Sequence, residues 1–271
     1  MFQEFTHKPY FLASLLQIAC DEDTPFGKRH LAVLILKNTI IDTWTSSEMQ
    51  QEEKDVTLDW LLKNIATDNY RIRSEVCRII GLTVSYDSPN LHPNLLPALT
   101  THSFTSSNPH QIHGSLLTLT HCVKNCDDRF HKHINQILDP LHTLFTTAHP
   151  DFKLAAMNLL TLCLNTWAWM EGVDDLALET ALGDMVVAKW VETVMQVAFD
   201  RSYVTGGGVP TTTTFNTMRL AFKALNILYS DISCKVPSSN VLALEDALDL
   251  LQANISSFVS EHCKSPLMRF F

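Results

Sequence analysis

Helix-forming segments follow one another in pairs along this 271-residue chain, and no segment has the alternating pattern of a β-strand. The first helix of each pair begins near residues 26, 70, 109, 151 and 214, so the pairs recur about every 40 residues until the last step. Two antiparallel helices cannot bury their apolar faces by themselves, so neighbouring pairs must stack. The recurring pairs therefore predict an all-α architecture.

A step of this length is typical of HEAT or armadillo repeats. We predict an α-solenoid of about five to six HEAT-type helical hairpins, wound into a right-handed superhelix and forming one array over residues 1–271. Residues 201–213, with three consecutive glycines at 206–208, lack the lysine and serine or threonine that end a phosphate-binding loop and are predicted to be a flexible insertion. The predicted helices cover residues 9–21, 26–43, 51–67, 70–86, 91–101, 109–126, 130–148, 151–170, 176–200, 214–231 and 240–262.

Residues 29–44, "RHLAVLILKNTIIDTW", are too apolar for a surface helix, whereas Lys37 and Asn38 are unsuited to a membrane span. A helix between neighbouring repeats and its own partner helix is apolar on nearly all sides. Lys37 is expected to extend its amino group to water, and Asn38 to form a hydrogen bond across a turn between repeats. A buried core helix of an ordinary all-α domain is the alternative.

The charge balance narrows the class of partner. The chain has 20 lysines and arginines against 29 acidic residues, a net charge of −9, which argues against direct nucleic-acid binding.

No apolar run reaches the roughly 18 to 20 residues that a bilayer span requires. The seven cysteines are odd in number and lie mostly in apolar helical patterns, which indicates buried free thiols in a reducing compartment. We expect a soluble intracellular protein.

The segment "LLQIACDEDTPFGKRHLAVLILKNTIIDTW" resembles the N-terminal signature of the importin-β (karyopherin-β) family. The matching features are an apolar helix that ends in an acidic turn, and then an arginine, a small residue, "LKN", an isoleucine and a tryptophan. Later segments, such as "QIHGSLLTLTHCVKNCDD" and "FNTMRLAFKALNILYSD", are similar to helices of the fourth to sixth repeats. Their detail favours the importin nine branch. The signature positions are Arg29, Ala32, Leu36, Lys37, Asn38, Ile40 and Trp44.

Members of this family are several times longer, so the chain is expected to correspond to the N-terminal arch, as a truncated product or a divergent fragment. Most of the first helix before "FLASLLQIA" is lacking, and the turn "SYDSPNLHPNLLPAL" has no tryptophan where the third repeat usually has one. The final "CKSPLMRFF" does not resemble a further repeat.

The resemblance implies binding and no catalysis. It implies a nuclear transport receptor, a monomer that shuttles between cytoplasm and nucleus. Implied partners are the small GTPase Ran in its GTP form, basic nuclear cargo such as core histones, and Phe-Gly nucleoporins. Ran-GTP and cargo would favour different curvatures of one superhelix, so each would weaken binding of the other. A HEAT scaffold without a transport role and a helical enzyme domain are the alternatives from other classes.

The predicted helix 51–67 is a candidate Ran-binding surface. Val56, Leu58, Leu61, Leu62 and Ile65 are expected to form its buried side. An outward stripe of Glu52, Asp55, Asp59 and Lys63 would face a basic patch on Ran. A solvated helix face with weak charge pairs, such as Asp59 with Lys63, is the alternative.

Two further clusters of residues are candidates for a functional site. The acidic residues Glu171, Asp174 and Asp175 are candidates for steering basic cargo, although acids also suit the start of a helix. Cysteines at 122 and 126 with histidines at 131 and 133 are residue types that bind zinc. Their spacing favours buried thiols beside surface histidines, so no metal or other cofactor is expected. No catalytic motif is present in the sequence, and the protein is not expected to be an enzyme.

Overall fold

The structure is a computed structural model that describes residues 10–46, 49–87, 92–102, 104–126, 133–147, 150–168, 184–198 and 212–228, with residues 249 and 253. Every regular element within these ranges is helical, which confirms the all-α prediction. Among these helices, none combines the length and the apolar character needed to cross a bilayer. The chain divides into two compact units, Met1–Thr166 and Trp167–Phe271. The single array over the whole chain, its right-handed winding and its repeat number stay predictions.

The helices of unit 1 follow the predicted segments closely. Pro109 and Pro150 are each the first residue of a helix, and Pro25 immediately precedes one. The helices are α2 (Phe11–Cys20), α3 (Phe26–Thr43), α4 (Gln51–Lys63), α5 (Tyr70–Asp87), α6 (Leu95–Pro97), η1 (Ala98–His102), α7 (Pro109–Cys126), α8 (Ile134–Thr147) and α9 (Pro150–Ala168).

The predicted helix 91–101 is confirmed only over residues 95–101, and not as one continuous α-helix. The structure has the three-residue helix α6, followed by the π-helical turn η1. Pro97 lacks an N–H, so a regular ladder of hydrogen bonds cannot continue through it. The chain then adopts the wider helical turn of Ala98–His102.

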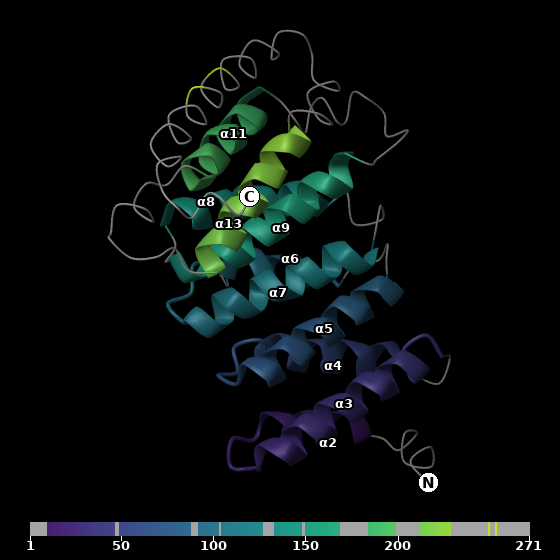
Figure 1. The fold of residues 1–271 in the computed structure, drawn as a ribbon. Coiled ribbons are helices and arrows are strands. Elements are labelled where there is room, and N and C mark those ends of the chain that lie inside the picture. Colours follow the sequence, from purple (N-terminus) through teal and green to yellow (C-terminus); the bar gives the residue numbers. More distant parts are fainter. Residues whose placement is uncertain are drawn as a thin grey trace. The chain divides into compact units, whose positions relative to one another are not determined.

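The helices of unit 1 form two layers. In the first layer, α3 contacts α5 and α5 contacts α7. In the other, α2 contacts α4, and η1 contacts α8. Helix α2 also packs on α3, and α4 on α5, so each hairpin bridges the layers (Figure 1). This is the arrangement of stacked helical hairpins in an α-solenoid of HEAT-like repeats.

Short side chains in the turns set where the helices of the first layer begin. The Asn69 side chain accepts hydrogen bonds from the backbone N–H groups of Arg71, at 3.1 Å, and Ile72, at 3.3 Å. Asn108 does the same for His110 at 2.9 Å. These bonds satisfy N–H groups that lack a partner within the first helical turn. Two successive helices of this layer, α5 and α7, thus begin with the same kind of asparagine cap.

Unit 2 is described through two helices, α11 (Asp184–Ala198) and α13 (Thr212–Ile227). They contact each other and bury Trp190 and Val194 of α11 with Ala221 and Ala224 of α13. The predicted helices 176–200 and 214–231 are confirmed over the described residues. The predicted helix 240–262 lies outside them, apart from residues 249 and 253, and so does the predicted insertion 201–213, apart from residues 212 and 213, which are the first residues of α13.

The packing of α7 on α5 places His113 against Tyr70, with ring centroids 5.9 Å apart. Burial lowers the pKa of His113 from 6.5, and the nearby Arg73 guanidinium and His110 lower it further. The Nδ1 atom of His113 is buried and has no hydrogen-bond partner among the described residues. The environment of this imidazole therefore favours its neutral form.

Burial also lowers the pKa of His121 on α7, helped by the charges of Arg78 and Lys124 and opposed by Glu75. Because the pKa values of both histidines are lower in the folded than in the unfolded chain, the unfolded chain binds more protons. The stability that these groups contribute is present above the unfolded value and is lost as the pH falls through the folded values. We expect the free energy of unfolding, measured with urea, to fall between about pH 7.5 and about pH 5.5. The double variant His113→Gln/His121→Gln should reduce this difference, and an unchanged difference would assign it to other groups.

Candidate partner-binding surface

The residues between positions 29 and 44 that carry the resemblance to importin-β fall on two faces of α3. Five of them are spaced three or four positions apart, which places them on one side of a helix. None of the five is more than 7% exposed, so this side forms part of the core of unit 1. They are Arg29, Ala32, Leu36, Ile40 and Trp44. Lys37 and Asn38 lie outside this buried stripe.

Arg29 holds the end of α2 against the start of α3. Its Nε donates a hydrogen bond of 3.0 Å to the carbonyl oxygen of Ala19, and the side chain is buried. Arg73 occupies the same place in α5, where its Nη1 donates to the carbonyl oxygens of Thr67 and Asp68. The sequence analysis missed Arg73. Its signal is the repeated spacing of an aromatic residue and an arginine in "FGKR" and "YRIR", at the starts of α3 and α5, which are neighbours in one layer.

Trp44 joins three helices at the end of α3. Its indole is fully buried, and Nε1 donates a hydrogen bond of 3.0 Å to the Asp87 carboxylate at the end of α5. Lys54 of α4 lies 5.5 Å from the centre of the Trp44 ring and 3.8 Å from the same Asp87 oxygen. A tryptophan is well suited to this place because its body is apolar and its N–H needs a buried partner.

The two polar signature residues differ from expectation. Lys37 does not extend to water, because its amino group lies 3.2 Å from the Glu75 carboxylate of α5 and its side chain is only 19% exposed. The ion pair connects neighbouring helices of one layer. Asn38 is exposed, and its side chain makes no hydrogen bond across a turn within the described part of the chain.

The predicted Ran-binding stripe on α4 is present in a modified form. Glu52, Asp59 and Lys63 are exposed along one side of the helix, as predicted. Val56, expected to be buried, is 52% exposed and lies between them, because positions 52, 56, 59 and 63 share one helix face. Thr57 takes the buried place beside Leu58, Leu61 and Ile65, and Leu62 is only half-buried. We call Glu52, Val56, Asp59 and Lys63 the α4 stripe.

The contacts of Asp55, Asp59 and Lys63 also differ in part from what was expected. Asp55 is half-buried at the edge of the α4 stripe, and it accepts a hydrogen bond of 2.8 Å from Gln51. Asp59 and Lys63 form no ion pair with each other or with any other described residue. On the neighbouring α2, Ile18 is 42% exposed. The layer formed by α2 and α4 thus presents unpaired charges and exposed apolar side chains.

The other candidate sites are not assembled within the described residues. The acidic group Glu171, Asp174 and Asp175 lies outside them, as does the glycine cluster 206–208. Cys122 and Cys126 are fully buried, and burial raises the pKa of the Cys122 thiol. In the parts of the chain that the structure describes, no three histidine, cysteine or acidic side chains are arranged to hold a metal ion.

Comparisons with known proteins add a similarity to one family for the N-terminal part. No curated protein matches the chain. A solved structure titled as an engineered protein from a structural genomics consortium is similar over 92% of this chain and 90% of that chain, at 14% identity and a TM-score of 0.45. The family model of the importin-beta N-terminal domain matches residues 2–67, which include α2, α3 and α4. The likeness to the importin-beta N-terminal domain is confined to residues 2–67 of this chain.

Proposed function

We propose that this protein acts as a nuclear transport receptor of the importin-β type and binds the GTP form of Ran through the layer of α2 and α4. The observation that carries the proposal is the match of residues 2–67 to the family model of the importin-beta N-terminal domain. This domain is the region with which the importin-β family binds Ran-GTP. The same region contains the α4 stripe.

The composition of the α4 stripe supports a protein partner. Its charges are Glu52, Asp59 and Lys63, and the exposed Val56 supplies apolar area between them. Interfaces of moderate affinity combine buried apolar contacts with charged groups at the rim. Rim charges of this kind accelerate association and select the partner more than they add affinity. A partner with a basic rim around an apolar centre fits this surface.

The remaining parts of the proposal follow from the domain family. The cargo is a basic nuclear protein such as a core histone, of the kind carried by the importin nine branch, and Glu171, Asp174 and Asp175 are the residues proposed to attract it. Phe-Gly nucleoporins are proposed as further partners. The receptor shuttles between cytoplasm and nucleus as a monomer.

The first experiment compares nucleotide states of Ran. Purified full-length chain is titrated with Ran loaded with GTP or with GDP, and binding is measured by calorimetry. A transport receptor is expected to bind Ran-GTP and not Ran-GDP, so that only Ran-GTP competes with cargo. Equal binding of both forms, or binding of neither, would favour a HEAT scaffold without a transport role.

A charge reversal in the α4 stripe tests the surface itself. Asp59→Lys is expected to weaken Ran-GTP binding about tenfold or more, because a favourable rim charge becomes repulsive. Asp42→Lys is the matched control, since Asp42 is exposed on α3 in the other layer and the change in net charge is the same. Equal affinities for the two variants would remove the α4 stripe from the Ran interface and leave the nucleotide experiment unaffected.

A further inference from the structure

Charged side chains from successive helices of the first layer are connected to one another. Glu75 of α5 lies 3.2 Å from the Lys37 amino group of α3 and 3.6 Å from the Arg78 guanidinium of its own helix. One carboxylate is therefore shared by two cations. The Arg78 side chain is 53% exposed, so much of its charge remains accessible to a partner.

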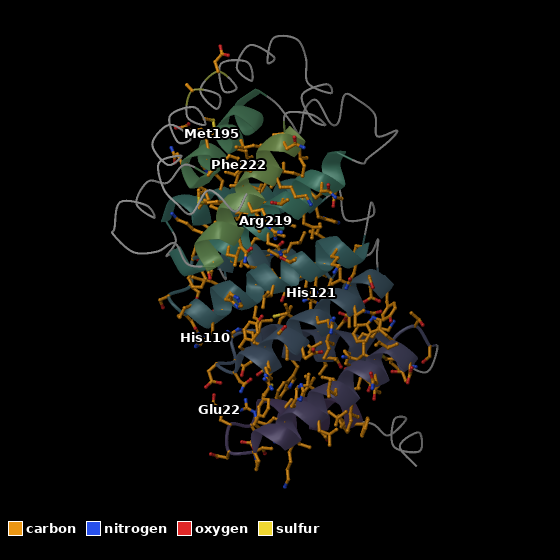
Figure 2. All side chains as sticks on the ribbon, viewed as in Figure 1. Glu22, His110, His121, Met195, Arg219 and Phe222 are labelled. Carbon is orange, nitrogen blue, oxygen red and sulfur yellow. The ribbon has the colours of Figure 1, made fainter. Side chains whose placement is uncertain are left out.

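The same row continues onto α7. Gly81 of α5 lets α7 approach closely, because a Cβ atom at this position would lie 2.5 Å from the Cβ of His121. Figure 2 shows His121 on the part of α7 that runs along α5. Lys124 is exposed three positions further along α7. Helix α7 contains no aspartate or glutamate, so its cations have no carboxylate of their own helix as a partner.

His121 is half-buried, and the charges of neighbouring side chains act on its imidazole. Burial lowers the pKa of His121, and the charges of Arg78 and Lys124 lower it further, against the opposing effect of Glu75. A half-buried imidazole between two cations thus marks a local excess of positive charge. This excess stands out on a chain whose net charge is −9.

We propose that Lys37, Arg78, His121 and Lys124 form a docking site for an extended acidic segment of a partner protein, which lies across α3, α5 and α7. We call these four residues the cationic belt. The site is distinct from the α4 stripe, because it lies on the other layer of unit 1 and is of the opposite charge. It does not depend on the binding of Ran.

The geometry of the layer sets the spacing of the acids in such a segment. Packed helices lie about 8–10 Å apart, and a polyproline II chain advances about 3.1 Å per residue with three residues per turn, so every third side chain points to the same side. An acidic side chain at about every third residue would therefore meet one helix after another. The step from α3 to α7 crosses two such intervals, so about seven residues span the cationic belt.

The probe is a synthetic peptide of about seven residues with blocked ends, with glutamate at the first, fourth and seventh positions and serine elsewhere. A peptide of the same composition with its three glutamates adjacent is the spacing control. Binding to the full-length chain is followed by fluorescence anisotropy at low salt, because exposed charge pairs are screened as salt is added. We expect the spaced peptide to bind several-fold more tightly than the control peptide.

Two double variants separate the cationic belt from net charge. Arg78→Glu/Lys124→Glu is expected to weaken binding of the spaced peptide about tenfold or more, because two favourable contacts become repulsive. Lys28→Glu/Arg71→Glu has the same change in net charge at exposed positions of α3 and α5 outside the belt. This control should change the affinity by less than about threefold. Thermal unfolding of each variant verifies that both remain folded.

The His121 imidazole gives a second measurement at the same site. An acidic peptide placed beside it would raise its pKa, which NMR titration of the ring protons measures directly. By linkage, the peptide should then bind more tightly as the pH is lowered through that pKa. The proposal is overturned if the spaced peptide does not bind, if both double variants bind it equally, or if the pKa of His121 does not move.

Discussion

The variant Trp44→Ala is expected to lower the free energy of unfolding by about 3–5 kcal/mol, the cost of removing a large buried aromatic side chain. The Trp44 indole is fully buried at the meeting point of α3, α4 and α5. Its removal leaves a cavity and also deprives Asp87 of the indole N–H. Urea unfolding, followed by circular dichroism, measures the change.

Two further variants divide this loss into its parts. Trp44→Phe keeps most of the apolar volume but removes the donor to Asp87, so its cost should be well below that of Trp44→Ala. Trp60→Ala is the matched control, because Trp60 is only half-buried on α4. A Trp44→Ala variant no less stable than Trp60→Ala would mean that the junction of the three helices does not depend on the indole.

The helices of this chain could be predicted from sequence because their signals are local. Apolar residues recur with helical spacing, and proline, asparagine and glycine mark the ends. Helix α3 was expected to be enclosed on nearly all sides, yet only one side is fully buried, and the apolar Leu31 and Ile41 are exposed. The prediction for residues 91–101 was less accurate, although a local signal was present there too. Pro97 has no N–H and interrupts the hydrogen-bond ladder.

The partners of charged side chains could not be predicted in the same way. Lys37 and Glu75 are 38 positions apart in sequence, and only the packing of α3 on α5 brings them to 3.2 Å. Val56 shows the complementary problem. Its apolar character predicted burial, yet the position shares a helix face with Glu52 and Asp59, so geometry exposes it.

The two surfaces of unit 1 have opposite character. The α4 stripe is acidic with an exposed valine, and the cationic belt on the other layer is basic. Two layers of a helical stack can therefore present different charges to different partners, because each helix has only one face committed to the core. The proposed Ran interface and the proposed acidic-segment site can therefore be tested independently.

The variant Gly114→Ala is expected to cost about 3 kcal/mol or more, at the upper end of what overpacking usually costs. A Cβ at Gly114 would lie 2.1 Å from the carbonyl oxygen of Ile65, which is backbone and cannot rotate away. The carbonyl oxygen of Gly114 also accepts hydrogen bonds from Thr118, at 2.8 Å, and Cys77, at 3.2 Å. Moving α7 away to relieve the clash would therefore disturb its contact with α5 as well.

Gly27→Ala is the matched control for that variant. No atom lies within 4 Å of the position of its Cβ, and the residue is helical, so alanine should stabilise the chain by up to about 1 kcal/mol. The two glycine variants thus change stability in opposite directions, although each adds a single methyl group to a helix. Urea unfolding of both proteins measures the difference. Equal stabilities would contradict the close packing of α7 on the end of α4 and, with it, the stacking of hairpins in unit 1.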